Sequence, residues 1–477
     1  MGSSTSAPVE EYPTTPPNYH VFTLTIRAPD KIKLIDASED IVKLVRRVLY
    51  EHYGGIQDER IGFEGGSVFK LFGCPFSQSG SFDLSVEIKT FFAMLLTQLY
   101  SRGWCLFLNS DLSRRFDNST LFFRRCAFPT QEFAITCLSL SHHDKFHLVN
   151  APESLYRVLL ECVGDQLQNS EVTEFCYVVK ILGYPWNNSN FYESTSARKL
   201  LLRIFKRFRE AAGFCYYGTV NLKGTADSIF FLQESPNPPP EEYCIISLNS
   251  SDRIRFVNCP ANLSEMAAQI VSTRWGGGLQ RFKNVEGIVE LKLVGYPWIA
   301  ESREGATASR DLIMHILKES VACGWAVLTA LDISRKAQDK SIFVMRNCTP
   351  STIPHFCISP ASHDKIRIIG ADPSMQAFVA DVIRQCWTFG VEAESTGYQG
   401  DYELKLYGYP WECSTCSDSF VLTRIMMTRI LTSLELAGWS VICSADVSSK
   451  TFSVNHRDQK EYYPADVHSW YVARTAR

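Results

Sequence analysis

The chain has 477 residues, of which 45% are hydrophobic and 21% are charged, and its formal net charge is −3. This length exceeds the size at which one hydrophobic core keeps growing, so several domains or a repeat array are expected. The small net charge disfavours a protein that binds nucleic acid through phosphate contacts. No stretch of about 18 apolar residues is present, which disfavours a membrane-spanning helix.

Residues 1–18 are rich in Ser, Thr and Pro and lack apolar periodicity, so they are predicted to form a disordered tail. Gly2, followed by Ser3 and with Ser6 at the sixth position, fits the acceptor pattern for N-myristoylation. No Lys or Arg precedes Arg27, and one acyl chain without a basic patch anchors weakly. We expect a cytoplasmic protein, with peripheral membrane attachment only if Gly2 is acylated.

A seven-residue motif, Lys-(Leu/Ile)-x-Gly-Tyr-Pro-Trp, organises the rest of the chain. It occupies residues 180–186, 292–298 and 405–411, and a weaker copy occupies residues 70–76. The interval of about 110 residues indicates one unit present four times. The predicted boundaries are 19–128 for repeat 1, 129–238 for repeat 2, 239–349 for repeat 3 and 350–477 for repeat 4.

In the first copy, residues 21–26 and 31–35 alternate and are rich in β-branched side chains, which predicts two strands. A helix follows, with Ile41, Val45 and Val48 on one face. After a glycine-bearing loop, the motif forms a third strand. This strand is expected to end at Gly-Tyr-Pro-Trp because Gly adopts positive φ and Pro cannot donate to a sheet.

A second helix is predicted near residues 196–212, 308–322 and 420–437, and a Gly-aromatic pair such as Gly324-Trp325 ends it. Two further strands complete the unit. The predicted fold class is therefore α+β. We expect four tandem β-β-α-β-α-β-β units, each with two helices packed on one face of a mostly antiparallel sheet.

Polar and aromatic residues that recur in repeats 3 and 4 are the candidate ligand-binding residues. They are Trp298, Arg310, Asp332, Ser334, Arg346, Trp411, Arg424 and Asp446. An arginine early in a helix opposes the helix dipole, so it should have a specific partner such as the Trp face or an acid. An Asp-x-Ser beside an Arg could hold a phosphate or an acidic peptide. The alternative is structural, with Trp as a core plug and Asp in a turn.

Enzyme signatures such as GxSxG, HExxH and the phosphate loop are missing from the sequence. Cys413 and Cys416 form a single CxxC pair without a second pair, which is weak evidence for zinc, so no metal and no cofactor are expected. The sequence favours a non-enzymatic repeat protein that acts as a scaffold for protein partners. The alternative is a small-ligand or phosphate-binding protein, a diverged enzyme included, with a Trp/Arg/Asp-lined site in repeats 3 and 4.

Overall fold

The computed structural model describes residues 21–475, except 78–80, 114–116, 188–189, 224–225, 234, 301, 335–339, 413–417, 449–450, 457–458 and 465–466. The predicted tail with Gly2 and the pair Cys413 and Cys416 lie outside the described residues.

Repeats 1 and 2 contain the same series of elements. In repeat 1 these are β1 (Val21–Arg27), β2 (Lys31–Ile35), α1 (Glu39–His52), β3 (Ile56–Ile61), β4 (Ser67–Leu71), α2 (Phe82–Tyr100), β5 (Trp104–Ser110) and β6 (Asp117–Arg125). In repeat 2 they are β7 (Ala134–Ser141), β8 (Lys145–Val149), α3 (Glu153–Val163), β9 (Leu167–Val172), β10 (Cys176–Ile181), α4 (Phe191–Ala212), β11 (Phe214–Val220) and β12 (Ser228–Gln233).

Repeats 3 and 4 continue the series, and repeat 4 carries one additional hairpin, β24–β25. Repeat 3 has β13 (Tyr243–Asn249), β14 (Arg253–Val257), α5 (Ala261–Arg274), β15 (Leu279–Val285), β16 (Ile288–Leu293), α6 (Arg303–Ala322), β17 (Trp325–Leu331) and β18 (Ile342–Asn347). Repeat 4 has β19 (His355–Ala361), β20 (Lys365–Ile369), α7 (Pro373–Cys386), β21 (Val391–Thr396), β22 (Tyr402–Leu406), α8 (Asp418–Leu436), β23 (Trp439–Ala445), β24 (Thr451–His456), β25 (Gln459–Pro464) and β26 (Ser469–Arg474).

Each repeat folds into a six-stranded sheet with equivalent strand order, which is β3-β4-β2-β1-β6-β5 in repeat 1. All neighbouring strands in this sheet pair antiparallel. The predicted architecture of four α+β repeats is confirmed. The six-stranded sheet of each repeat has one strand more than expected, namely β3, β9, β15 or β21, which pairs with the motif strand at the outer edge of the sheet.

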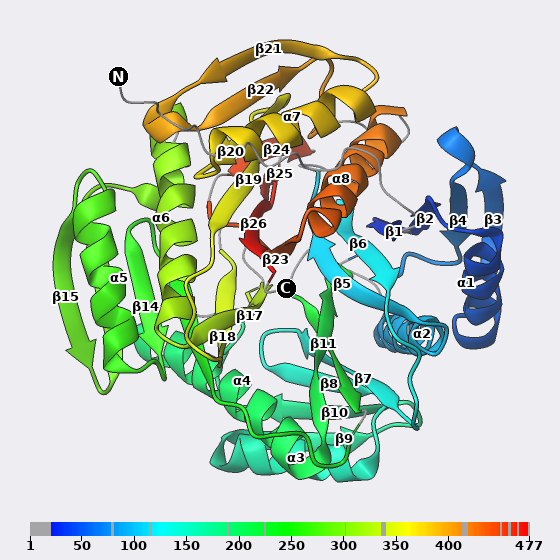
Figure 1. The fold of residues 1–477 in the computed structure, drawn as a ribbon. Helices are drawn as coiled ribbons and strands as arrows, with labels where there is room; N and C mark the ends of the chain where they lie inside the picture. Colours follow the sequence, from blue (N-terminus) through cyan, green and yellow to red (C-terminus); the bar gives the residue numbers. More distant parts are fainter. Residues whose placement is uncertain are drawn as a thin grey trace, which may run out of the picture.

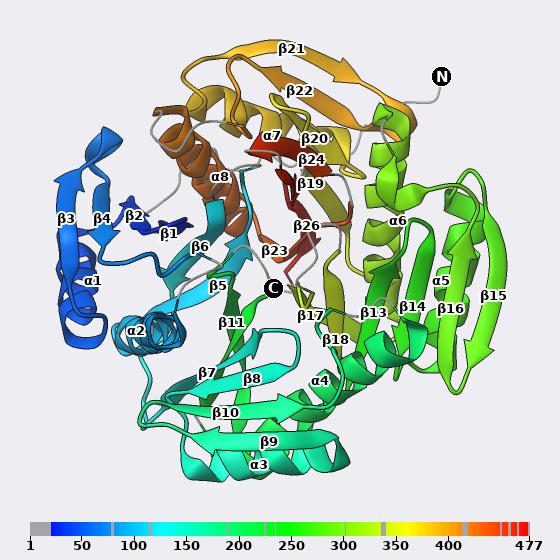
Figure 2. The same cartoon turned by 180° about the vertical axis from the view of Figure 1, so that it is seen from behind.

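The four repeats close into a ring (Figures 1 and 2). The second helix of each repeat packs on the first strand of the next sheet: α2 on β7, α4 on β13, α6 on β19 and, closing the circle, α8 on β1. Strands β5, β11, β17 and β23 converge at the centre, where β5 contacts β11 and β23, and β17 contacts β23.

This position explains the composition of the two kinds of helix. Helix α1 buries one stripe of residues that includes Ile41, Val45 and Leu49. Helix α2 lies between two sheets and buries residues around most of its circumference, among them Phe91 and Phe92. A helix that is apolar on nearly all sides is stable in water only when it is covered on nearly all sides.

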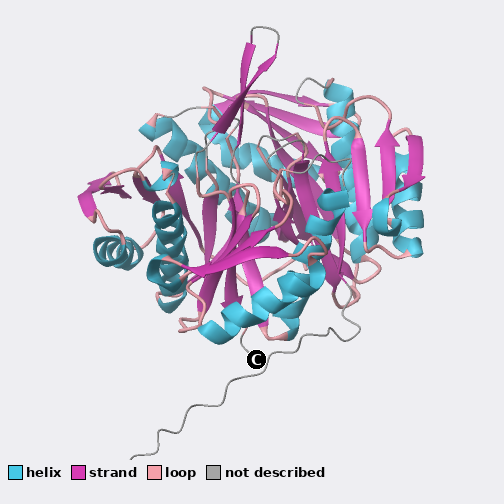
Figure 3. Cartoon of the chain, turned by 90° about the horizontal axis from the view of Figure 1, so that it is seen from above, coloured by secondary structure: helices cyan, strands magenta, loops and turns pink. Residues whose placement is uncertain are grey.

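Helices lie beside strands throughout the molecule (Figure 3). In the repeat 2 sheet, Ile135 and Cys137 pack in one core cluster with α2 of repeat 1, whereas Leu138 and Leu140 pack in another with α3 and α4. The sheet therefore has its own helices on one side and the second helix of the preceding repeat on the other. None of the helices in the described part of the chain is long and apolar enough to cross a bilayer.

Candidate functional site

The motif turn has the same geometry in all four repeats. Its glycine has positive φ in every copy, from +67° at Gly73 to +83° at Gly408, which glycine adopts without the steric cost that a Cβ imposes. The aromatic residue three positions later is buried in each copy, as Phe76, Trp186, Trp298 and Trp411. The indole N–H groups of Trp298 and Trp411 donate to the carbonyls of Arg253 and Lys365, at 3.1 and 2.7 Å.

The tyrosine of the same motif points the other way. Tyr184, Tyr296 and Tyr409 are 62%, 69% and 64% exposed. The residue before each motif glycine is also apolar and exposed, and the four copies of it are Phe72, Leu182, Val294 and Tyr407. Each of repeats 2 to 4 therefore presents a pair of exposed apolar side chains that flank the glycine, which we call the motif pair.

The recurring basic residue of the second helix is buried against the next repeat. Arg310 donates from Nε to the hydroxyls of Ser359 and Ser469 in repeat 4, at 2.8 and 3.2 Å. The guanidinium of Arg424 is fully buried and lies 3.6 Å from the ring centre of Phe420, which packs in one cluster with Ile35 of repeat 1. In repeat 1 the equivalent Lys89 contacts Ser141 and His147 of repeat 2. These residues therefore join neighbouring repeats.

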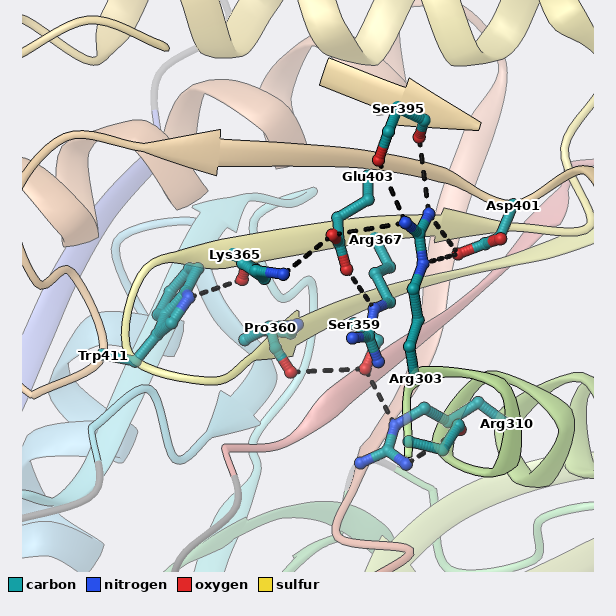
Figure 4. A network of polar contacts seen from close by, with 11 residues as sticks. Arg303, Arg310, Ser359, Pro360, Lys365, Arg367, Ser395, Asp401, Glu403 and Trp411 are labelled. Atoms are coloured by element: carbon teal, nitrogen blue, oxygen red, sulfur yellow. Dashed lines mark hydrogen bonds and ion pairs between the residues drawn. The ribbon is translucent and has the colours of Figure 1, made fainter. Parts of the chain in front are cut away.

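A denser ionic network joins repeats 3 and 4 (Figure 4). Glu403 on β22 accepts hydrogen bonds from Arg367 and Lys365, at 2.7 and 3.0 Å. Arg303, at the start of α6, lies between Glu403 and Asp401, with nitrogen–oxygen distances of 3.5 and 3.1 Å. The network ties the first turn of α6 to the edge of the next sheet.

The Asp-x-Ser segments form a second set of contacts between repeats. Within each segment the aspartate Oδ1 accepts the amide of the serine, as from Ser334 to Asp332 at 2.9 Å. The segment follows the central strand of its repeat, and its first residue forms a hydrogen bond with the start of the last strand of the preceding repeat. Asn221 N donates to Ser119 Oγ, Asp332 N to Asp227 Oδ2 and Asp446 N to Ser341 Oγ, and His468 N donates to Asp111 O. We call these four contacts the clasps.

The clasp of repeats 2 and 3 is predicted to be sensitive to pH. Burial raises the pKa of Asp227 to about 7, against the opposing effect of the Asp332 amide. The folded protein then holds this proton up to about pH 7, whereas the unfolded chain releases it near the ordinary value of 3.8. The unfolded state binds fewer protons in this window, so stability falls as pH rises through it and levels off above it.

Replacing Asp227 with serine, the residue that forms the clasp in repeats 1 and 3, should remove this pH dependence. The free energy of unfolding of the Asp227→Ser variant, relative to wild type, is expected to rise by about 2–4 kcal/mol between pH 4 and pH 8. Urea unfolding at several pH values measures it, and Asp165→Ser, at an exposed position, is the control. A difference that does not change with pH would contradict the prediction.

The eight residues predicted as a ligand site are not brought together at one place. Trp298 and Trp411 are core residues, and Arg310 and Arg424 lie between repeats. Asp332, Ser334 and Asp446 belong to clasp segments. Arg346 is exposed and pairs with Glu241 at 3.3 Å. Ligand binding by these eight residues stays a prediction, and their separate structural partners do not favour it.

The register of the last strand corrects one equivalence between repeats. Arg124 and Arg346 pair with the second residue of the preceding strand, Cys105 and Ala326. Arg474 pairs with the first residue, Trp439, so it lies one position later. The recurrence of arginine in this strand is therefore weaker than the sequence suggested.

A small cavity of about 70 Å³ lies at the centre of the ring. It is lined by the four central strands, each of which has a β-bulge at the same position, namely Phe107, Tyr217, Leu328 and Ile442. Polar contacts cross between these strands, such as Tyr216 OH to Thr329 Oγ1 at 2.7 Å. Among the described residues, no cluster of His, Cys, Asp and Glu could hold a metal ion.

The sequence did carry a signal for the motif pair. The tyrosine recurs in three copies as consistently as the tryptophan does, and it sits next to a glycine in a turn, where a side chain is rarely buried. An aromatic residue that recurs in several repeats but is exposed is explained by a role at the surface, not by packing in the core. Tyr296 and Tyr409 lie two positions before the buried Trp298 and Trp411, so recurrence alone does not distinguish the two kinds of aromatic residue.

Comparison with known proteins agrees with the four repeats. Neither the curated proteins nor the solved structures contain a match to the chain. One domain family model matches the sequence four times, over residues 20–124, 134–232, 242–346 and 354–473. The chain therefore belongs to this domain family and contains four members of it in tandem.

Proposed function

We propose that the chain is a non-enzymatic scaffold that binds protein partners through the motif pairs of its repeats. The observation that carries this proposal is the exposure of Tyr184, Tyr296 and Tyr409. Core packing accounts for the tryptophan of the same motif, because it is buried. It does not account for an aromatic side chain that stays in solvent in three copies. Exposed aromatic residues are among the strongest contributors to protein interfaces.

The ring gives these sites a fixed spacing. Each repeat is held to the next by a packed helix, by a clasp and by buried basic residues. A partner with two or more matching segments would bind its second site at a high effective concentration, so weak individual contacts would add to a strong one. This advantage supports the presence of several copies in one chain.

The test is to replace the three tyrosines together. The triple variant Tyr184→Ser, Tyr296→Ser and Tyr409→Ser should fold normally, because exposed substitutions usually change stability by less than about 0.5 kcal/mol. It is expected to lose at least about tenfold in recovery of the partners that cross-link to wild type, whereas each single variant loses only a few-fold. Quantitative cross-linking with mass spectrometry measures this.

A matched control replaces equally exposed aromatic residues outside the motif. Tyr50 and Tyr192 are 60% and 59% exposed, so the variant Tyr50→Ser, Tyr192→Ser should retain the partners. Equal loss of partners in both variants, or no loss in the triple variant, would contradict a role for the motif pairs.

A further inference from the structure

The junction of repeats 3 and 4 contains a cavity of about 450 Å³. None of the motif-pair residues lines it. Its polar lining comes from Arg274 at the end of α5, Asp311, His315 and Lys318 on α6, and His355 and Gln399 of repeat 4. Its volume is within the range of small-molecule sites.

The charged groups of the cavity are arranged around Asp311. This buried carboxylate lies 3.8 Å from Arg274 and 3.3 Å from Nδ1 of His315. His315 Nδ1 is also 2.9 Å from the carbonyl of Asp311, which can only accept, so Nδ1 carries the proton and donates to this carbonyl. Lys318 adds a second cation. Lys318 also lies 3.8 Å from Glu319, which does not line the cavity, so the lining itself holds two cations and one carboxylate.

His355 brings a second feature. Its Nδ1 lies 2.9 Å from the carbonyl of Ile353, so Nδ1 is the protonated nitrogen. Its Nε2 is buried and has no hydrogen-bond partner within the described part of the chain. Burial lowers the pKa of His355, which keeps the ring neutral and Nε2 an acceptor. A buried acceptor without a donor costs free energy that a ligand could recover.

The fold does not require His355 or Asp311, because the other junctions have different residues at the equivalent positions. The strand position of His355 is occupied by Val21, Ile135 and Tyr243 in the other repeats, as the pairing register shows. The helix position of Asp311, one after the recurring basic residue, is occupied by Thr90, Lys199 and Ile425. The four junctions share one fold, but His355 and Asp311 occur at only one of them. A function specific to this junction explains these two residues better than a requirement of the fold does.

We propose that this cavity binds a small phosphate monoester, with Arg274 and Lys318 holding the phosphate and His355 accepting a hydrogen bond from a hydroxyl of the same molecule. A phosphate supplies negative charge and several acceptor oxygens for the donors of Arg274 and Lys318. A neighbouring hydroxyl supplies the donor that His355 Nε2 lacks.

The experiment is a calorimetric titration of the full chain with glycerol 3-phosphate, with glycerol as the neutral comparison. Glycerol 3-phosphate is expected to bind and glycerol is not. Arg274→Gln and Lys318→Gln should each weaken binding about tenfold, as expected for loss of one charge-assisted contact. Lys206→Gln, at the equivalent helix position of repeat 2, should bind like wild type.

A second variant separates binding from folding. His355→Val introduces the residue that repeat 1 has at this position, so it should fold and keep or raise the melting temperature while binding weakens. A purely structural histidine would instead show a lower melting temperature and unchanged binding. The proposal is overturned if glycerol 3-phosphate does not bind at millimolar concentration, or if it binds equally to wild type and to Arg274→Gln, Lys318→Gln and His355→Val.

Discussion

Replacing Trp298 with alanine is expected to lower the free energy of unfolding by about 3–5 kcal/mol, the usual cost of removing a large aromatic side chain from a core. Trp298 is fully buried, and its indole N–H donates to the carbonyl of Arg253, which would lose this partner. Chemical denaturation followed by circular dichroism measures the change.

The neighbouring tyrosine provides the control. Tyr296→Ala removes an aromatic side chain from the same turn, but Tyr296 is 69% exposed, so the expected change is within about 0.5 kcal/mol. Trp298 belongs to the core, and Tyr296 belongs to the surface. Similar destabilisation by the two variants would contradict that division.

The second large effect is expected at Glu403. Glu403→Gln should destabilise the protein by about 3–5 kcal/mol, because it removes the carboxylate from a buried pair and leaves Arg367 without its counter-charge. Replacing Glu403 and Arg367 together with leucine should restore much of the loss, since no uncompensated charge then remains buried. Unfolding experiments on the single and double variants measure both effects.

The stability that the Glu403→Gln variant loses should depend on pH. Burial opposes ionisation of Glu403, but the hydrogen bonds and charges of Arg367 and Lys365 outweigh it and lower its pKa. A carboxyl with a lowered folded pKa contributes stability above its unfolded pKa, and this is lost as pH falls through the folded pKa. The difference between wild type and Glu403→Gln should therefore be complete at neutral pH and shrink below about pH 4.

An exposed ion pair on the same sheet is the control for the network. Lys405 and Glu392 lie 2.7 Å apart, and both side chains are 37% exposed. Such pairs contribute about 0–1 kcal/mol, so Glu392→Gln should change stability little. If Glu392→Gln lowered the free energy of unfolding as much as Glu403→Gln does, burial would not determine how much these ion pairs contribute to stability.

The sequence predicted the repeat, the helices and most strands because their apolar patterns have regular periods. It did not predict the edge strands such as β3, whose residues Gln57, Asp58 and Glu59 are exposed on both faces. A strand that buries neither face has no alternating pattern to detect. The sequence therefore predicts a loop over these polar residues.

Closure of the ring could not be predicted because it depends on contacts between the two ends of the chain. The apolar circumference of helices such as α2 indicates that they are covered on most sides, but not by which sheet. Residues that recur between repeats, such as Arg310 and Asp332, serve contacts between neighbouring repeats. His355 and Asp311 occur at a single junction, so recurrence does not mark them.

The contact between repeats 4 and 1 tests the ring most directly. Arg429 on α8 lies 3.9 Å from Asp36 of repeat 1, and both are partly exposed. In the variant Arg429→Lys, a zero-length carbodiimide cross-linker should join residue 36 to residue 429, and Arg429→Gln should give no such product. Cross-links confined to repeats that are adjacent in sequence, with none between repeats 4 and 1, would contradict a closed ring.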